Sequence, residues 1–248
     1  MLLKRITLLR ERVSDWSKYP FRVPAIASLE EITIRKSLVF FVGENGSGKS
    51  TLLEAIAIHY GFGAEGGNRN FRNQSTESVR SVDPLVNALR LAFSRRTGRG
   101  FFLRAESFFN TATVVDDLGV TQAYGGKSLH GQSHGESFLS LAENKINRDG
   151  LYIMDEPEAA LSPQRQLSLL VVLHDLLKSK REVQVIIATH SPILLAFPDA
   201  QILSFDDGTV HEIAYEQTPA YQFYNRFLAD PERYLNQLFN EEPLFDGK

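Results

Sequence analysis

Short apolar runs, separated by longer amphipathic stretches, form the main pattern along this chain. Runs of this length with few polar residues are typical of strands that are buried on both faces of a sheet. They occupy residues 38–42, 101–103, 151–154, 183–188, 201–205 and 209–214. Helical patterns lie between several of them, over residues 50–60, 84–93, 138–146 and 164–177. Strands that alternate with helices indicate an α/β fold with a mainly parallel sheet covered by helices.

The remaining segments complete this outline. Residues 2–9 and 31–36 are expected to form outer, antiparallel strands, and 61–83, rich in Gly, Asn, Ser and Arg, a long loop or insertion. In 219–240, aromatic residues recur on both sides of a Asp-Pro-Glu break. We interpret this last segment as two short helices that pack on the body of the protein.

Composition restricts the class of protein. With 248 residues, 43% of them hydrophobic, the chain can bury a sizeable core as one large domain, alone or with a small appendage. The absence of cysteine excludes disulfides and thiolate metal sites. No long apolar run follows the basic start, so we expect no signal peptide or membrane span, and a cytoplasmic location.

Charge is spread unevenly. The net charge of −3 argues against a protein coated in nucleic acid. Between residues 66 and 99, however, seven arginines face only two acidic residues, a local balance of +5 (7 − 2). This segment is either a candidate nucleic-acid contact or a solvated loop whose arginines form ion pairs.

A phosphate-binding loop follows the first apolar run. Residues 43–51, GENGSGKST, match G-x-x-x-x-G-K-[ST] and lie between an expected strand and an expected helix. The glycines let successive N–H groups point at phosphate oxygens, and the helix N-terminus adds positive potential. Lys49 is expected to reach the β- and γ-phosphates, and Ser50 to bind Mg²⁺. The nucleotide-binding residues are therefore predicted to be Gly43, Asn45, Gly46, Ser47, Gly48, Lys49, Ser50 and Thr51.

The nucleotide base can be inferred in part. GTPases of this class read guanine with an N-K-x-D loop, and the nearest match, NKIN at 144–147, lacks the aspartate. ATP is therefore favoured.

Acidic residues follow the run 151–154. Asp155 is placed to hold Mg²⁺, and Glu156 to polarise the water that attacks the γ-phosphate. His190, after the run 183–188, would lie near Asp155 if the two strands are neighbours, and could then contact phosphate or the attacking water.

The stretch HGQSHGES, residues 130–137, precedes the apolar face of the helix expected over 138–146. His130 and His134 could form a metal pair, although no third ligand is apparent. Ser133 and Glu136 match an S-x-x-E capping box, whose helix N-terminus could bind phosphate or serve only as a cap.

Together these motifs resemble those of an ABC-type ATPase. GENGSGKST is similar to the Walker A loop, LYIMDEP to the Walker B strand with its catalytic glutamate, and ATHS to the switch histidine. The stretch 130–137 falls where that family has its S-G-G-Q signature, so Ser133, Gly135 and Glu136 would contact nucleotide. The resemblance implies catalytic roles for Glu156, His190 and Lys49, and a head-to-tail homodimer that closes on two ATP molecules.

Other family positions match less well. The resemblance implies a glutamine-bearing loop near residues 101–109, where Glu106 is the expected stand-in as a metal ligand. Ser162 replaces the aspartate that usually ends the loop after Walker B. Trp16, Tyr19 and Phe21 are the candidates for stacking on adenine, with packing in the core as the alternative for each.

The resemblance covers about residues 1–215. It implies a P-loop NTPase with an ABC-type domain: a mainly parallel central sheet, an antiparallel N-terminal subdomain, and an insertion with a helical, signature-bearing subdomain over about 61–148. Residues 216–248 would form a C-terminal helical appendage. The motif sequences are more similar to those of the RecF, SMC and overcoming-lysogenisation-defect group than to those of transporter subunits. The chain shows no heptad pattern for a coiled-coil arm.

Three functions stay open at this point. The ATPase could act on nucleic acid or on a partner that handles it, in repair or phage defence. It could instead be the nucleotide-binding subunit of a membrane transporter, docked on a permease. The third alternative is a slowly hydrolysing, ATP-gated binding module.

Overall fold

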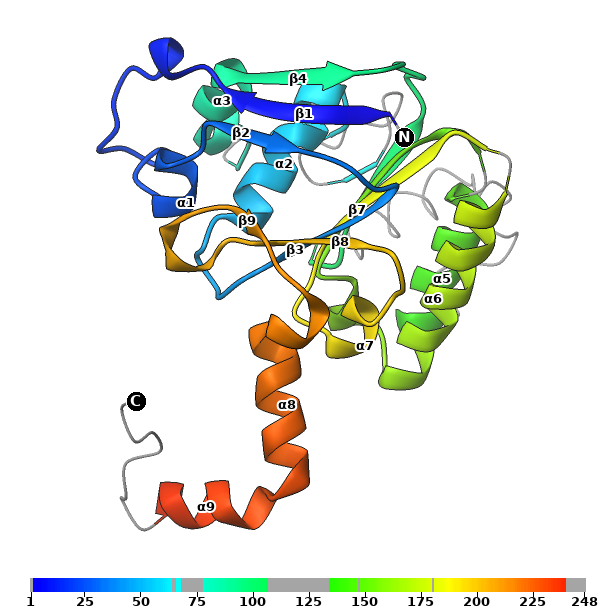
Figure 1. Ribbon diagram of the computed structural model, residues 1–248. Coiled ribbons are helices and arrows are strands. Elements are labelled where there is room, and N and C mark those ends of the chain that lie inside the picture. Colours follow the sequence, from blue (N-terminus) through cyan, green and yellow to red (C-terminus); the bar gives the residue numbers. More distant parts are fainter. Residues whose placement is uncertain are drawn as a thin grey trace.

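Two sheets organise the protein in the computed structural model, which describes residues 2–63, 66–67, 78–106, 134–146, 148–179 and 181–239. The larger sheet has six strands in the order β5-β6-β7-β3-β8-β9, and the smaller has three in the order β2-β1-β4 (Figure 1). The strands of the larger sheet are β5 (Gly100–Arg104), β6 (Gly150–Asp155), β7 (Val183–Ala188), β3 (Leu38–Val42), β8 (Gln201–Ser204) and β9 (His211–Glu212). Those of the smaller sheet are β2 (Glu31–Thr33), β1 (Leu3–Leu8) and β4 (Leu89–Phe93).

Helices cover both faces of the larger sheet. One face meets α2 (Lys49–Tyr60), which lies between the two sheets, and the other meets α5 (His134–Lys145) and α6 (Pro163–Lys178) (Figure 1). The remaining helices are α1 (Pro24–Ala27), α3 (Ser78–Ala88), α7 (Pro192–Leu195), α8 (Pro219–Ala229) and α9 (Pro231–Phe239), with 3₁₀ helices η1 (Arg10–Arg12), η4 (Pro157–Ala160), η5 (Asp206–Gly208) and η6 (Tyr215–Gln217).

The parallel strands are apolar throughout because side chains on both faces are buried. Every residue of β3, β6 and β7 is buried. Alternate positions point to opposite faces of a strand. Phe41 therefore belongs to the core shared with α2 and the smaller sheet, and Phe40 to the core under α5 and α6. The predicted mainly parallel sheet covered by helices is confirmed.

A buried polar side chain joins the two sheets. Gln184 on β7 is fully buried. Its Oε1 accepts from the backbone N–H of Leu2 and of Leu3 at 3.1 and 2.6 Å, and its Nε2 donates to the Leu3 carbonyl at 3.0 Å. The start of β1 is thereby fixed against the larger sheet.

Three sequence-based expectations were wrong, at least in part. Residues 78–83, expected to end a long loop, form the first part of α3. Residues 89–93 form a strand rather than the end of a helix, because β4 pairs antiparallel with β1 and that pairing overrides the local helical pattern. The segment 219–240 does contain two helices, but no residue of α8 or α9 is buried. Phe223, Phe227 and Tyr234 pack on one another instead, and both helices project from the body (Figure 1). The division of the chain near residue 215 stays a prediction.

Within the described residues, no helix combines the length and the apolar character that crossing a bilayer requires.

Candidate functional site

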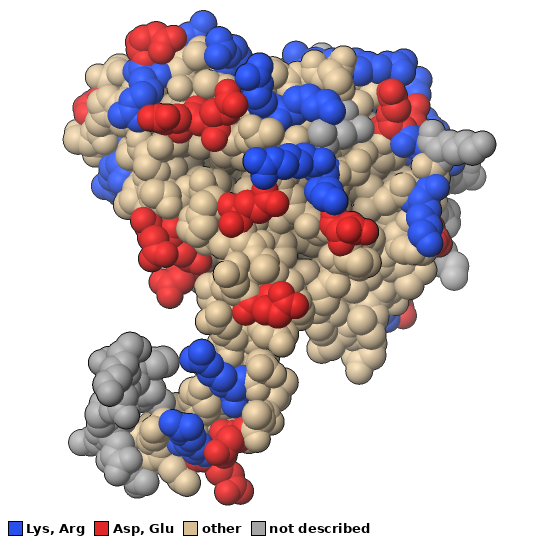
Figure 2. All heavy atoms as spheres, viewed as in Figure 1, with Lys and Arg blue, Asp and Glu red and all other residues tan. Residues whose placement is uncertain are grey.

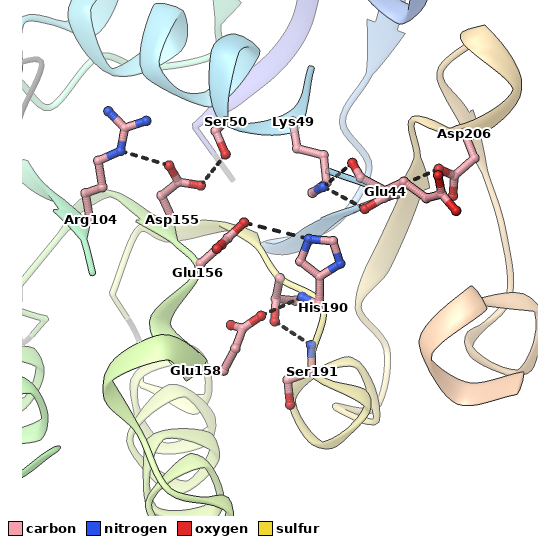
Figure 3. Close-up of polar contacts among 12 residues, drawn as sticks. Glu44, Lys49, Ser50, Arg104, Asp155, Glu156, Glu158, His190, Ser191 and Asp206 are labelled. Atoms are coloured by element: carbon pink, nitrogen blue, oxygen red, sulfur yellow. Dashed lines mark hydrogen bonds and ion pairs between the residues drawn. The ribbon is translucent and has the colours of Figure 1, made fainter. Parts of the chain in front are cut away.

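Three neighbouring strands bring the motif residues to one edge of the larger sheet. β7 pairs parallel with β6 on one side and with β3 on the other. The carboxyl ends of parallel strands meet at the same edge, so the loops after β3, β6 and β7 converge there (Figure 3). The role considered for His190 depended on the strands before Asp155 and His190 being neighbours, and that condition is met.

The loop after β3 has the backbone that its glycines allow. Gly43, Gly46 and Gly48 have φ values of 141°, 83° and 104°, a region that L side chains rarely adopt. The loop runs directly into α2, which starts at Lys49. Ser47 Oγ is buried without a hydrogen-bond partner in the described part of the chain. Such an unsatisfied polar atom fits a loop that is completed by a ligand.

Lys49 lies across this loop. Its Nζ donates to the Gly43 carbonyl at 2.6 Å and to the Glu44 carbonyl at 2.9 Å. Burial lowers the pKa of Lys49, and the carboxylates of Glu156, Asp206 and Asp155 act in the opposite direction. The amine is thus a buried cation held by neutral carbonyl groups, which a phosphate could replace.

Asp206, which sequence reasoning missed, supports the loop from outside. Its Oδ1 accepts from the Glu44 N–H at 2.9 Å (Figure 3). Asp206 follows β8, which is the other parallel neighbour of β3. The sequence did contain a signal for Asp206, because it is an acidic residue that directly follows the apolar run 201–205.

A buried ionic network surrounds the end of β6. Asp155 Oδ1 accepts from the Ser50 hydroxyl at 2.9 Å, and Asp155 Oδ2 lies 3.2 Å from Arg104 Nε (Figure 3). Arg104 also pairs with Glu54, with NH1 3.1 Å from Oε2. Burial raises the pKa of Asp155, although Arg104 and the Ser50 hydroxyl oppose that shift. Sequence reasoning named Ser50 and Asp155 but neither Arg104 nor Glu54.

Glu106, the expected metal ligand from this loop, lies outside the network. Its side chain is 85% exposed, and its nearest ionic contact is Arg104 Nε at 3.9 Å. The reason is position: Arg104 ends β5 directly opposite Asp155, whereas Glu106 lies two residues beyond the strand. The structure thus brings Arg104, not Glu106, to Asp155.

Glu156 and His190 face each other across the same edge. Glu156 Oε1 lies 3.7 Å from His190 Nε2, and Glu156 adopts a left-handed backbone with φ of 50°. Burial, and then Lys49, lowers the pKa of His190, so the ring is neutral at neutral pH. A neutral imidazole can donate from one nitrogen and accept at the other.

Glu158, also missed from the sequence, fixes the His190 loop. Its Oε1 accepts from the His190 N–H at 2.5 Å (Figure 3). Burial raises the pKa of Glu158, and the bond from His190 N–H acts against this. The turn after β6 and the turn after β7 are therefore linked directly.

The signature stretch is described only from residue 134 onward, so Ser133 lies outside the described residues. Gly135, in the first turn of α5, is buried, and a Cβ there would lie 2.5 Å from Arg165 Cδ and 3.2 Å from the Ala160 carbonyl. Glu136 Oε1 lies 2.9 Å from Arg165 NH2. The start of α5 is thus tied to η4 and α6 of the same chain. Ser162 caps α6 by accepting from Arg165 N–H.

The three aromatic candidates for adenine differ in position. Phe21 is 2% exposed and belongs to the core, so it packs in the core and is not available to stack on adenine. Trp16 is partly exposed, with Arg10 over its ring at 4.2 Å. Tyr19 is 40% exposed, and its hydroxyl lies 2.9 Å from Thr51 Oγ1. Of the three, Tyr19 contacts the phosphate loop.

Solved structures similar to this chain include the SMC head domain from Thermotoga maritima, with 17% identity, 86% of this chain and 99% of that chain covered, and a TM-score of 0.45. An ATP-binding cassette of an ABC transporter gives 17% identity, 94% and 97% coverage, and a TM-score of 0.49. The xylose import ATP-binding protein XylG of Thermoanaerobacter pseudethanolicus is 24% identical over 178 residues. That match covers 63% of this chain and 35% of the relative, so the chain spans about a third of that relative's length.

Family models agree with the geometry. A model described as AAA ATPase domain matches residues 133–195, and one described as ABC transporter matches residues 32–159, which is more than half of the chain. The second match includes the phosphate loop and the strand that ends at Asp155. The chain belongs to the ABC family of ATPases, and it is an enzyme that binds and hydrolyses ATP.

Proposed function

We propose that this ATPase hydrolyses Mg²⁺-bound ATP at the edge where β3, β6 and β7 end, within a head-to-tail homodimer. The observation that carries the proposal is the convergence of Lys49, the Ser50–Asp155 contact and the Glu156–His190 pair at one edge (Figure 3). Lys49 binds the β- and γ-phosphates, and Glu156 accepts a proton from the attacking water. His190, kept neutral, orients that water or the γ-phosphate.

The residues present fit a magnesium ion. Mg²⁺ prefers oxygen ligands and is usually held by one or two protein groups together with phosphate oxygens and water. Ser50 Oγ and Asp155 Oδ1 lie side by side, and no group of three or more His, Asp or Glu side chains suited to a metal occurs in the described ranges. Ser50 and Asp155 would hold the ion, which supplies positive charge beside the phosphates.

The dimer part of the proposal rests on the start of α5. A helix N-terminus attracts phosphate through the positive end of its dipole. Gly135 leaves no room for a side chain there, and Glu136 is held by Arg165. In the proposed dimer, Ser133, Gly135 and Glu136 of one copy contact the ATP that is bound by the phosphate loop of the other.

Ser133→Arg tests this arrangement. The variant is expected to bind ATP as the unmodified protein does, because the phosphate loop is untouched, but to lose ATP-dependent dimerisation. Hydrolysis should fall about 100-fold or more, the usual effect of removing a group that stabilises the transition state. Light scattering coupled to size exclusion and a steady-state phosphate assay measure the two effects.

Asn144→Arg is the matched control, since Asn144 is exposed near the end of α5. It should dimerise and hydrolyse ATP normally. If Ser133→Arg dimerises with ATP as well as this control does, the proposed contact between Ser133 of one copy and the ATP of the other is wrong.

Nucleic-acid handling is the first candidate for the work that the ATPase performs. In Figure 2, Lys and Arg side chains gather over the smaller sheet. Arg5 and Arg90 lie on the exposed face of β1 and β4, where Thr7 pairs with Arg90. Arg5 also pairs with Glu31, with NH1 3.5 Å from Oε2, Arg95 pairs with Glu182, and Arg96 lies over the rings of Tyr60 and Phe93. Support for the candidate therefore comes from the gathering of positive side chains over the smaller sheet, and not from any single unpaired arginine.

The Arg5→Ala, Arg90→Ala double variant is expected to weaken DNA binding and to flatten its dependence on salt. Each phosphate contact that is lost lowers the slope of log affinity against log salt by about one. Fluorescence anisotropy with a labelled duplex at several salt concentrations measures this. Arg95→Ala, Arg96→Ala is the comparison. An affinity that is independent of salt in all three proteins would exclude nucleic acid as the ligand of this face.

The relative with a xylose import name favours a second candidate, the nucleotide-binding subunit of a transporter. Co-purification with a membrane-embedded permease would decide for it. An ATP-gated binding module is distinguished by dimerisation with ATP at a negligible rate of steady-state hydrolysis.

A further inference from the structure

Arg104 is the cation that contacts both Asp155 and Glu54 in the described part of the chain. Its guanidinium lies between two carboxylates: Nε is 3.2 Å from Asp155 Oδ2, and NH1 is 3.1 Å from Glu54 Oε2. Glu54 and Asp155 are 6% and 4% exposed, so water does little to screen either charge. Glu54 Oε1 also has no hydrogen-bond partner among the described residues.

Backbone geometry fixes this arrangement. Arg104 is the register partner of Asp155 where β5 and β6 end. Ser50 and Glu54 are four residues apart on α2, so they share one helix face, and Ser50 bonds to Asp155. The network therefore surrounds the same Asp155–Ser50 pair to which the proposed function assigns the magnesium ion.

The charges show what Arg104 does there. Counted as ionised groups, these two carboxylates and the guanidinium together carry −1, and the two carboxylates without Arg104 would carry −2. Two buried carboxylates beside a hydroxyl oxygen form a site that attracts a divalent cation. Arginine cannot serve as a ligand, because it has only donors and stays protonated, and it repels a second cation.

We propose that the Arg104 guanidinium, held between Glu54 and Asp155, repels a divalent ion from this site. Because of that repulsion, the site binds a divalent ion only together with nucleotide. A nucleoside triphosphate brings further oxygen ligands and negative charge, which offset the guanidinium. Glu54 anchors Arg104 from the helix side and keeps it at Asp155. Arg104 is in this sense a positioning residue, and the inference rests on the proposed magnesium role of Asp155.

The test uses Mn²⁺ as the probe and the full chain without nucleotide. Bound Mn²⁺ is followed by electron paramagnetic resonance in the unmodified protein and in Arg104→Met, Arg104→Lys and Arg104→Met combined with Glu54→Gln. Arg104→Met is expected to bind Mn²⁺ at least about tenfold more tightly than the unmodified protein. Arg104→Lys keeps the charge and should gain nothing, and the double variant should lose most of the gain.

Thermal unfolding gives a second measurement. Without metal, Arg104→Met should unfold about 6–10 °C lower, because two buried carboxylates lose their cation. Mn²⁺ should restore most of that loss, while the double variant should fold and depend less on metal. Arg95→Met, which removes the exposed pair with Glu182, is the matched control and should change neither measurement.

Equal Mn²⁺ affinity of Arg104→Met and the unmodified protein would overturn the proposal. So would a gain in Arg104→Lys as large as that in Arg104→Met, because charge would then not be the cause. Neither measurement requires ATP. A separate hydrolysis assay of Asp155→Asn tests the proposed function, so failure of the magnesium assignment can be told apart from failure of the role of Arg104.

Discussion

Glu156→Gln is expected to bind ATP, to hydrolyse it extremely slowly, and to accumulate as an ATP-bound dimer. The side chain is partly exposed, with Oε1 3.7 Å from His190 Nε2, where a water next to the γ-phosphate could be reached. Glutamine has the same shape but cannot accept the proton of that water. Loss of a general base costs about 100-fold to 10,000-fold in rate.

The backbone at this position should survive the change. Glu156 N–H donates to the Ala188 carbonyl at 2.9 Å, and its left-handed backbone is set by the turn into η4 rather than by the carboxylate. We therefore expect an unchanged unfolding temperature without nucleotide.

Size-exclusion chromatography with light scattering, run with ATP and Mg²⁺ and again with ADP, measures the trapped state. Glu143→Gln, an exposed position on α5, is the matched control and should behave as the unmodified protein. A Glu156→Gln protein that stays monomeric at saturating ATP would contradict the proposed head-to-tail homodimer.

The phosphate loop could be predicted because its chemistry is local. The residues from Gly43 to Thr51 are contiguous, and positive φ angles at three glycines are a property of the loop itself. That the loops after β6 and β7 lie at the same edge was also predictable, because parallel strands place their carboxyl ends together. The catalytic roles of these residues stay predictions.

Contacts that depend on lateral register could not be predicted. Arg104 meets Asp155 only because β5 aligns with β6 at that residue, and no local pattern encodes the alignment. Residues 89–93 likewise follow their pairing with β1, which lies far away in sequence. A periodic pattern indicates which face of a helix is apolar, but not what covers that face. For this reason α8 and α9 were expected to pack on the body of the protein, whereas in the structure they project from it.

Lys49→Ala is expected to abolish ATP binding with little effect on the fold. Lys49 is 3% exposed, and its two hydrogen bonds to the Gly43 and Glu44 carbonyls place the amine inside the loop. A bond from the ammonium to a charged phosphate oxygen is stronger than a bond to a neutral carbonyl, so loss of the phosphate bonds should lower the ATP affinity about 100-fold or more.

Stability should respond differently from binding. Burial lowers the pKa of Lys49, which means that keeping this amine charged costs free energy of folding. Alanine removes that cost together with two hydrogen bonds, and the two opposing effects leave the unfolding temperature without nucleotide nearly unchanged. Titration calorimetry with ATP, and a thermal melt of the same samples, measure the two quantities. Lys36→Ala, at an exposed position, is the control for both. An ATP affinity of Lys49→Ala within tenfold of that control would mean that the loop 43–51 is not where the phosphates bind, whatever the melt shows.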